Sequence, residues 1–234
     1  MTCGECGSPL DDDVVCHACG AARPPRHGMS RVAWLDFAAR EHVGLDLVSK
    51  AALHVEELRA TDTFGCVHAQ SVLGQGPSAS VALAARVPLI DFHAEVHATL
   101  LPGAELVVNV RQSTAGRIGV RLMDAGGIAV EKAMPSASGA ELSWLARKRL
   151  ETFGARSRMR PTVLRVSMIG QRLRVHVDGE PVVSVEDDLQ GLGRVAVGMT
   201  VVPSRSTALV IWGFEVKMPT AQIPIPVPPP PPGR

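Results

Sequence analysis

Two pairs of cysteines near the N-terminus have the residue type and spacing of a metal site. Cys3 and Cys6 form one Cys-x-x-Cys pair, Cys16 and Cys19 form the other, and each pair is followed by glycine. Glycine lets the backbone turn beneath the sulfur atoms without a clash from a Cβ atom. Four thiolates from two such turns surround Zn²⁺ as in structural zinc sites. The spacing therefore predicts one structural zinc ion bound by Cys3, Cys6, Cys16 and Cys19.

The remaining cysteine and histidine near these motifs have other expected roles. His17 lies inside the second pair, but four thiolates already close the site, so it is not expected to be a ligand. Cys66 stands alone in an apolar stretch and is expected to be a small buried side chain. This cysteine usage indicates a reducing compartment rather than a disulfide framework.

A second group with metal-binding residue types lies on a predicted strand. Residues 92–100 alternate apolar and polar positions, which places His93, Glu95 and His97 on one face. Two imidazoles and a carboxylate at this spacing suit Zn²⁺ or Fe²⁺. An exposed polar sheet face has the same pattern, and the sequence leaves both interpretations open. Outward positions on neighbouring predicted strands add polar residues that could line a groove, namely Asn109, Arg111, Arg121 and Glu131.

The elements that position these residues are predicted to be strands. Period-two alternation recurs over roughly ten to thirteen short segments separated by Gly, Asp, Ser and Pro, which is typical of an antiparallel β-sandwich. Asp178-Gly179 predicts a two-residue hairpin turn between residues 172–177 and 180–185, because a type I′ turn needs positive φ at both positions. Residues 31–60 fit either a helix or edge strands.

Composition divides the chain into four segments. The expected boundaries are a zinc ribbon at 1–22, a linker at 23–30, a β-sandwich at 31–218 with its core at about 60–218, and a disordered Pro-rich tail at 219–234. The formal net charge is +1, so no global charge favours nucleic acid or an anionic membrane. No secretory signal and no apolar run long enough to span a membrane is present, and a cytoplasmic protein is expected.

Two resemblances follow from these patterns. Residues 3–20 resemble the short zinc-ribbon domains that begin many bacterial proteins, which implies a structural metal and a docking role. Roughly residues 60–218 resemble a concanavalin A-like jelly roll of the laminin-G and family-16 glucanase-related kind. The segments that carry this second resemblance are residues 88–96, 164–166, 172–183, 193–198 and 210–216. Such domains include lectins, glycosidases and interaction modules, so the fold alone does not fix a function.

The sequence lacks the acid pattern expected of a catalytic site in this fold. Glycosidases of the resembling fold place alternating acids on one concave strand, and the chain contains neither Glu-x-Asp-x-x-Glu nor Glu-x-Asp-x-Glu. The chain is therefore predicted not to be an enzyme, and to be a zinc-binding interaction or scaffold protein whose partner is a protein. The alternative is a carbohydrate-binding, lectin-like protein or a glycoside hydrolase-related enzyme. Sugar binding would depend on few aromatic platforms, since the chain has no tyrosine and three tryptophans, with Trp212 expected in the core.

A cluster of cations could contact phosphates. It comprises Arg147, Lys148, Arg149, Arg156, Arg158 and Arg160, opposed by Glu151. A solvated loop has the same composition, and a nucleic-acid partner is not expected because aromatic residues are not interleaved with the cations.

Overall fold

The computed structural model describes residues 29–36, 41–47, 53–59, 65–71, 78–137, 139–151, 161–189, 191–201 and 208–219. Every regular element in these residues is a β-strand. The strands are β1 Met29–Asp36, β2 Glu41–Val43, β3 Leu45–Leu47, β4 Leu53–Arg59, β5 Gly65–Ser71, β6 Ser78–Ala85, β7 Phe92–Leu100, β8 Glu105–Ser113, β9 Gly116–Met123, β10 Gly127–Ser136, β11 Gly139–Arg149, β12 Thr162–Ile169, β13 Arg172–Val177, β14 Glu180–Glu186, β15 Arg194–Val201 and β16 Ala208–Pro219.

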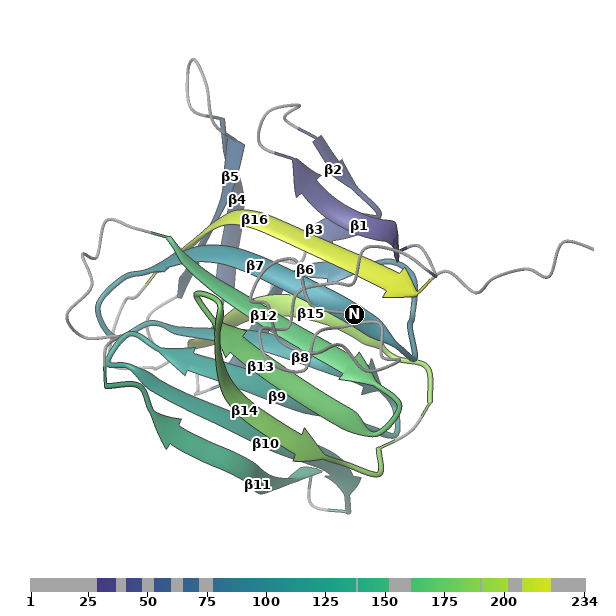
Figure 1. Ribbon diagram of the computed structural model, residues 1–234. Coiled ribbons are helices and arrows are strands. Elements are labelled where there is room, and N and C mark those ends of the chain that lie inside the picture. The colour runs from purple at the N-terminus through teal and green to yellow at the C-terminus, as the bar shows by residue number, and fades with distance from the viewer. Residues whose placement is uncertain are drawn as a thin grey trace, which may run out of the picture.

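The strands form two antiparallel sheets that stack on each other (Figure 1). The nine-stranded sheet has the order β14-β13-β12-β7-β16-β1-β2, and the β4–β5 hairpin joins it through β5 and β16. The seven-stranded sheet has the order β11-β10-β9-β8-β15-β6-β3. Strands far apart in sequence are neighbours in both sheets, as in a jelly roll. The predicted fold class, an antiparallel jelly-roll β-sandwich, is confirmed.

The core lies between the two sheets. Phe92, Ala94 and Val96 on β7 are fully buried, and they belong to one hydrophobic cluster with Leu106 and Val108 on β8. Burial of alternate residues along each strand fixes which residues point away from the core, because successive side chains point to opposite faces. The polar residues of β7 therefore lie on the outer face of the nine-stranded sheet.

The predicted hairpin turn is present. Asp178 and Gly179 both have positive φ, at 53° and 90°, between β13 and β14. The Asp178 side chain also accepts a hydrogen bond from the Val163 backbone N–H at 2.8 Å, and the Asp178 N–H donates to the Val163 carbonyl at 2.8 Å. The turn is thus held against β12 as well as closing its own hairpin.

The choice left open for residues 31–60 is settled for the described residues. They contribute β1, β2, β3 and β4, and contain no helix. β1 begins at Met29, within the range predicted for the linker, and β16 ends at Pro219, where the tail was predicted to begin. The predicted zinc ribbon and the tail beyond Pro219 lie outside the described residues. The described part of the chain has no helix long and apolar enough to cross a membrane.

Candidate functional site

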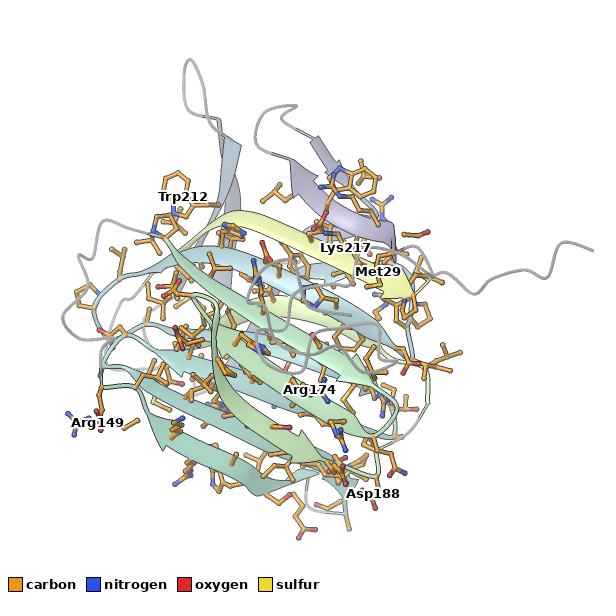
Figure 2. The ribbon with its side chains drawn as sticks, in the orientation of Figure 1. Met29, Arg149, Arg174, Asp188, Trp212 and Lys217 are labelled. Carbon is orange, nitrogen blue, oxygen red and sulfur yellow. The ribbon has the colours of Figure 1, made fainter. Side chains whose placement is uncertain are left out.

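The outer face of the nine-stranded sheet carries a row of polar side chains that crosses five strands. His176 on β13 is paired with Arg165 on β12, Arg165 with Glu95 on β7, Glu95 with Glu215 on β16, and Glu215 with Trp34 on β1. Directly opposed residues of antiparallel strands point to the same face, with Cβ atoms about 4.5–5.5 Å apart. The row therefore consists of one imidazole, one guanidinium, two carboxylates and one aromatic ring. We call these residues and their outward neighbours His93, His97, Ser167, Arg174, Lys217 and Arg31 the polar face; Figure 2 labels Arg174 and Lys217.

Glu95 lies at the centre of the polar face and is held by two side chains. Its Oε1 lies 2.6 Å from Nε2 of His97, and its Oε2 accepts a hydrogen bond from Nε of Arg165 at 2.6 Å. The hydrogen bond to His97, together with Arg165, lowers the pKa of Glu95 to about 2, although partial burial opposes this shift. Glu95 is therefore an anion at neutral pH and accepts hydrogen bonds without donating them.

Glu215 is the second carboxylate of the row. Its side chain forms ion pairs with Arg31 on β1 and with Lys217 on its own strand, the latter with Nζ 2.5 Å from Oε2. Arg165, Arg31 and Lys217 thus surround the two carboxylates with positive charge. This charge offsets the repulsion that two adjacent anions would otherwise exert on each other.

His93 is almost fully buried in the polar face, with 5% of its surface exposed, as are Ser167 at 2% and His176 at 1%. Its Nδ1 lies 2.8 Å from Oγ of Ser167 on β12. Burial lowers the pKa of His93 to about 4; Lys217 and Arg165 act in the same direction, while Glu95 and Glu215 oppose them. The imidazole is neutral at pH 7, and its hydrogen-bond partner is a side chain of the neighbouring strand β12.

These contacts decide between the two interpretations of His93, Glu95 and His97. His93 is engaged with Ser167, whereas Glu95 and His97 bond each other. Within the described residues, no group of three or more His, Cys, Asp or Glu side chains is placed to hold a metal ion. The trio is part of a polar sheet face whose partners are protein side chains.

The polar face continues into a groove at one edge of the sheet. The groove has a volume of about 580 Å³ and is lined by outward residues of β13 and β14, including Arg172, Arg174, His176, Ser184 and Glu186. Arg172 is paired with Glu186 at 2.9 Å across its rim. Hydrogen-bonding groups therefore extend from β14 across the sheet toward Trp34.

The tryptophans occupy three different environments. Trp34 is partly buried at the end of the polar row, and the guanidinium carbon of Arg31 lies 5.8 Å from its ring centroid. Trp212 was predicted to be core, but it lies in a bulge of β16, is partly exposed and donates from Nε1 to Thr99 Oγ1 at 2.8 Å. Trp144 is 46% exposed on β11 of the other sheet.

The predicted polar groove of Asn109, Arg111, Arg121 and Glu131 is only partly formed. Arg121 pairs with Glu131 at 2.9 Å, and Arg117, which the sequence did not single out, bonds Asn109 at 3.5 Å. Asn109 and Glu131 are almost fully buried, at 2% and 1% exposure, so they form a closed network on the seven-stranded sheet.

Arg111 does not belong to that network. Its backbone has φ of 50° and lies within the register shift of the β8–β9 pairing, between Val110 and Ser113. Its guanidinium donates to the carbonyls of Leu189, Gly170 and Ile90. Arg111 thereby connects the loops at one end of the two sheets. The prediction that its side chain points outward and lines a polar groove was wrong. A non-glycine residue at positive φ gives no periodicity signal, which is why alternation misplaced it.

Sequence reasoning also missed Glu215, Arg165 and Lys217. Each lies on a strand remote in sequence from β7, and local alternation does not reveal which strands become neighbours. A search for two acids on one strand could not find Glu95 and Glu215, because they meet by cross-strand pairing.

Comparisons with known proteins support the fold. No protein-family model matches the chain, and no curated protein matches it. Among solved structures, the CBM2 module of the evolved Dit protein of Lactobacillus casei BL23 phage J-1 matches with a TM-score of 0.56 at 9% identity, covering 84% of this chain and 98% of that one. The catalytic domain of an endo-1,3-β-glucanase (laminarinase) from Thermotoga petrophila RKU-1 matches with a TM-score of 0.51 at 12% identity, covering 82% and 99%. At these identities the likeness shows the fold alone.

The prediction that the chain is not an enzyme is corrected. It depended on finding no pair of acids on one strand, yet the fold is shared with a glucanase catalytic domain, and the sheet brings Glu95 and Glu215 together from two strands.

Proposed function

We propose that the chain binds a carbohydrate across the polar face of the nine-stranded sheet. The observation that carries this proposal is the continuous cross-strand row from His176 through Arg165, Glu95 and Glu215 to Trp34. Six interstrand spacings separate β14 from β2, about 29 Å at 4.8 Å each, which is room for a linear oligosaccharide.

The side chains of the polar face match the chemistry of sugar hydroxyls. Anionic Glu95 and Glu215 accept hydrogen bonds, whereas Arg165 and Lys217 donate them. The ring of Trp34 offers an apolar surface to the C–H face of a pyranose at the end of the row. Because ion pairs within the protein hold these charges in place, the site is ordered before a ligand arrives.

Of the two functions that the sequence left open, this proposal favours carbohydrate binding over a protein-interaction scaffold. Two solved structures that share the fold are named as the catalytic domain of an endo-1,3-β-glucanase and as a CBM2 module. The polar face supports the same choice, because its surface is built from hydrogen-bonding groups rather than from an apolar patch of the kind that docks proteins.

Hydrolysis of the bound glycan is a second candidate function, favoured by the pairing of Glu95 with Glu215. Retaining glycosidases need two carboxyl groups about 5–5.5 Å apart. Glu95 and Glu215 are directly opposed on antiparallel strands, which brings their Cβ atoms to about 4.5–5.5 Å and lets both carboxyl groups reach one ligand. Glu95, ionised by His97 and Arg165, has the charge state of a nucleophile.

Isothermal titration calorimetry against laminarin, mixed-linkage β-glucan and starch tests the binding proposal. We expect the wild-type chain to bind at least one of them and Trp34→Ala to weaken that binding about 10-fold, equivalent to about 1.4 kcal/mol. Arg86→Ala is the control, because it replaces a side chain that is paired with Asp46 and lies outside the polar face. No binding by the wild type, or equal binding by Trp34→Ala and wild type, would contradict the proposal.

A further inference from the structure

The open edge of the seven-stranded sheet carries a cluster of exposed cations. Arg147, Lys148 and Arg149 are consecutive at the end of β11, and all three are exposed. Figure 2 shows Arg149 projecting away from the body of the molecule. Since β11 pairs only with β10 in this sheet, its other edge has no neighbouring strand among the described residues.

The cations surround a groove with a shallow floor. The groove has a volume of about 480 Å³ and is lined by Met123, Gly127, Ala129, Trp144 and the three cations, besides Ile128. Arg147 is paired across the strands with Ala129, and Arg149 with Gly127. These partners have small side chains or none, so the long arginine side chains meet little steric obstruction from β10, although Ala129 itself is 1% exposed.

The cations of the groove differ from most other arginines of the described chain in lacking an acidic partner. Arg31, Arg86, Arg117, Arg121, Arg165 and Arg172 each form an ion pair with a described carboxylate. No described carboxylate lines the groove. Three positive charges at the groove are therefore left without a described acidic partner, whereas Arg31, Arg165 and Lys217 on the other sheet are each ion-paired with Glu95 or Glu215.

Trp144 orients one of these cations. The guanidinium carbon of Arg147 lies 3.6 Å from the ring centroid of Trp144. Stacking uses the flat face of the guanidinium and leaves its in-plane N–H groups available. These N–H groups form the fork that binds a carboxylate through two parallel hydrogen bonds. Arg147 is thus held ready for a planar oxyanion, with Arg149 on the same face of β11, whereas Lys148 alternates to the opposite face.

We infer that the groove at the β10–β11 edge binds a uronate residue of an acidic polysaccharide. The carboxylate of the sugar bonds the Arg147 fork, Arg149 supplies further charge, and Met123 and the edge of Trp144 contact the sugar ring. A single-stranded nucleic acid fits less well, because such sites stack successive bases on several aromatic rings. Trp144 is the one aromatic residue in this lining. The site lies on the opposite sheet from the polar face and does not depend on the proposed function.

Titration with hexa-galacturonate at low salt tests this inference on the full chain. We expect Arg147→Ala/Arg149→Ala to weaken binding at least 10-fold. Arg147→Lys keeps the charge but loses the fork and the stacking, and should weaken binding about 5-fold. Arg86→Ala removes a cation that is paired with Asp46 and lies in neither site, so its affinity should equal that of the wild type. Neutral cello-hexaose should not bind this site.

Three results would overturn the inference. The first is no binding of hexa-galacturonate by the wild type. The second is equal binding by the wild type and Arg147→Ala/Arg149→Ala, at unchanged thermal stability. The third is tighter binding of a twelve-residue oligothymidylate than of hexa-galacturonate at the same salt concentration, which would assign the groove to nucleic acid. Binding of neutral glycans at the polar face does not change how these three results are interpreted.

Discussion

Glu95 and Glu215 stand directly opposite each other on β7 and β16, far apart in sequence but adjacent on one sheet face. Each carboxylate is bonded to a different set of cations, Arg165 and His97 for Glu95, and Arg31 and Lys217 for Glu215. Two neighbouring anions in separate hydrogen-bond networks can act independently on a ligand that spans both strands.

Replacement of either glutamate by glutamine should separate binding from cleavage. If the pair hydrolyses glycans, Glu95→Gln and Glu215→Gln should each reduce the release of reducing ends from laminarin at least 100-fold, because each carboxylate has a separate role. Binding of the intact polysaccharide should change less than 10-fold. A wild-type chain that binds laminarin and releases no reducing ends would leave the polar face as a binding site and exclude hydrolysis of this substrate.

The burial of His93 should make the fold sensitive to acid. Its pKa is about 4 in the folded chain and 6.5 when unperturbed, so the unfolded state binds the extra proton first as pH falls. Stability from this group is complete above pH 6.5 and is lost as the pH falls from 6.5 to 4, by about 3 kcal/mol. Urea unfolding at pH 7 and pH 4 measures the loss.

The variant His93→Gln isolates this effect, because it cannot gain a proton. Its stability should fall less than that of the wild type between pH 7 and pH 4. Glu95 has a lowered pKa, so its own contribution is lost only below pH 4.5, toward pH 2. An equal acid-induced loss in His93→Gln and wild type would show that another group controls this pH range.

Gly193→Ala should destabilise the chain through Arg111. A Cβ atom at Gly193 would lie 2.2 Å from the Arg111 carbonyl carbon, and the Gly193 backbone is bonded to Leu89 in both directions. Neither backbone segment can move freely, so we expect a loss of about 3 kcal/mol in chemical denaturation. Leu192→Ala, at an adjacent exposed position, is the control and should change stability by less than about 0.5 kcal/mol.

The N-terminal cysteines lie outside the described residues, and their zinc site stays a prediction. Elemental analysis should find one zinc per chain, and it should be lost in the variant Cys3→Ser/Cys6→Ser. Cys16→Ser should make residues 1–25 sensitive to limited proteolysis while the β-sandwich stays resistant, because a segment this short depends on metal for folding. Zinc that persists in the double variant would place the metal elsewhere in the chain.

Local patterns predicted the strands but not their neighbours. Alternation in residues 92–100 correctly placed His93, Glu95 and His97 on one face, and Asp178-Gly179 correctly marked a hairpin turn. The partners of Glu95, on β12 and β16, depend on pairing between distant strands, which local alternation does not encode. The guanidinium of Arg111 binds carbonyls from three separate loops, which are distant in sequence. The residues next to Arg111 therefore give no signal that predicts its positive φ.

The position of β16 has a consequence for biosynthesis. This strand lies between β7 and β1 and also pairs with β5, so it joins three earlier parts of the chain. During translation β7 and β1 are made long before β16 and each waits with an unsatisfied edge. Unpaired edges of this kind are templates for pairing with other strands, so the edges of β7 and β1 are open to mispairing until β16 is in place. Glu95 and Glu215 come together only when β16 pairs with β7. Ligand binding at the polar face would therefore indicate that β16 has paired correctly.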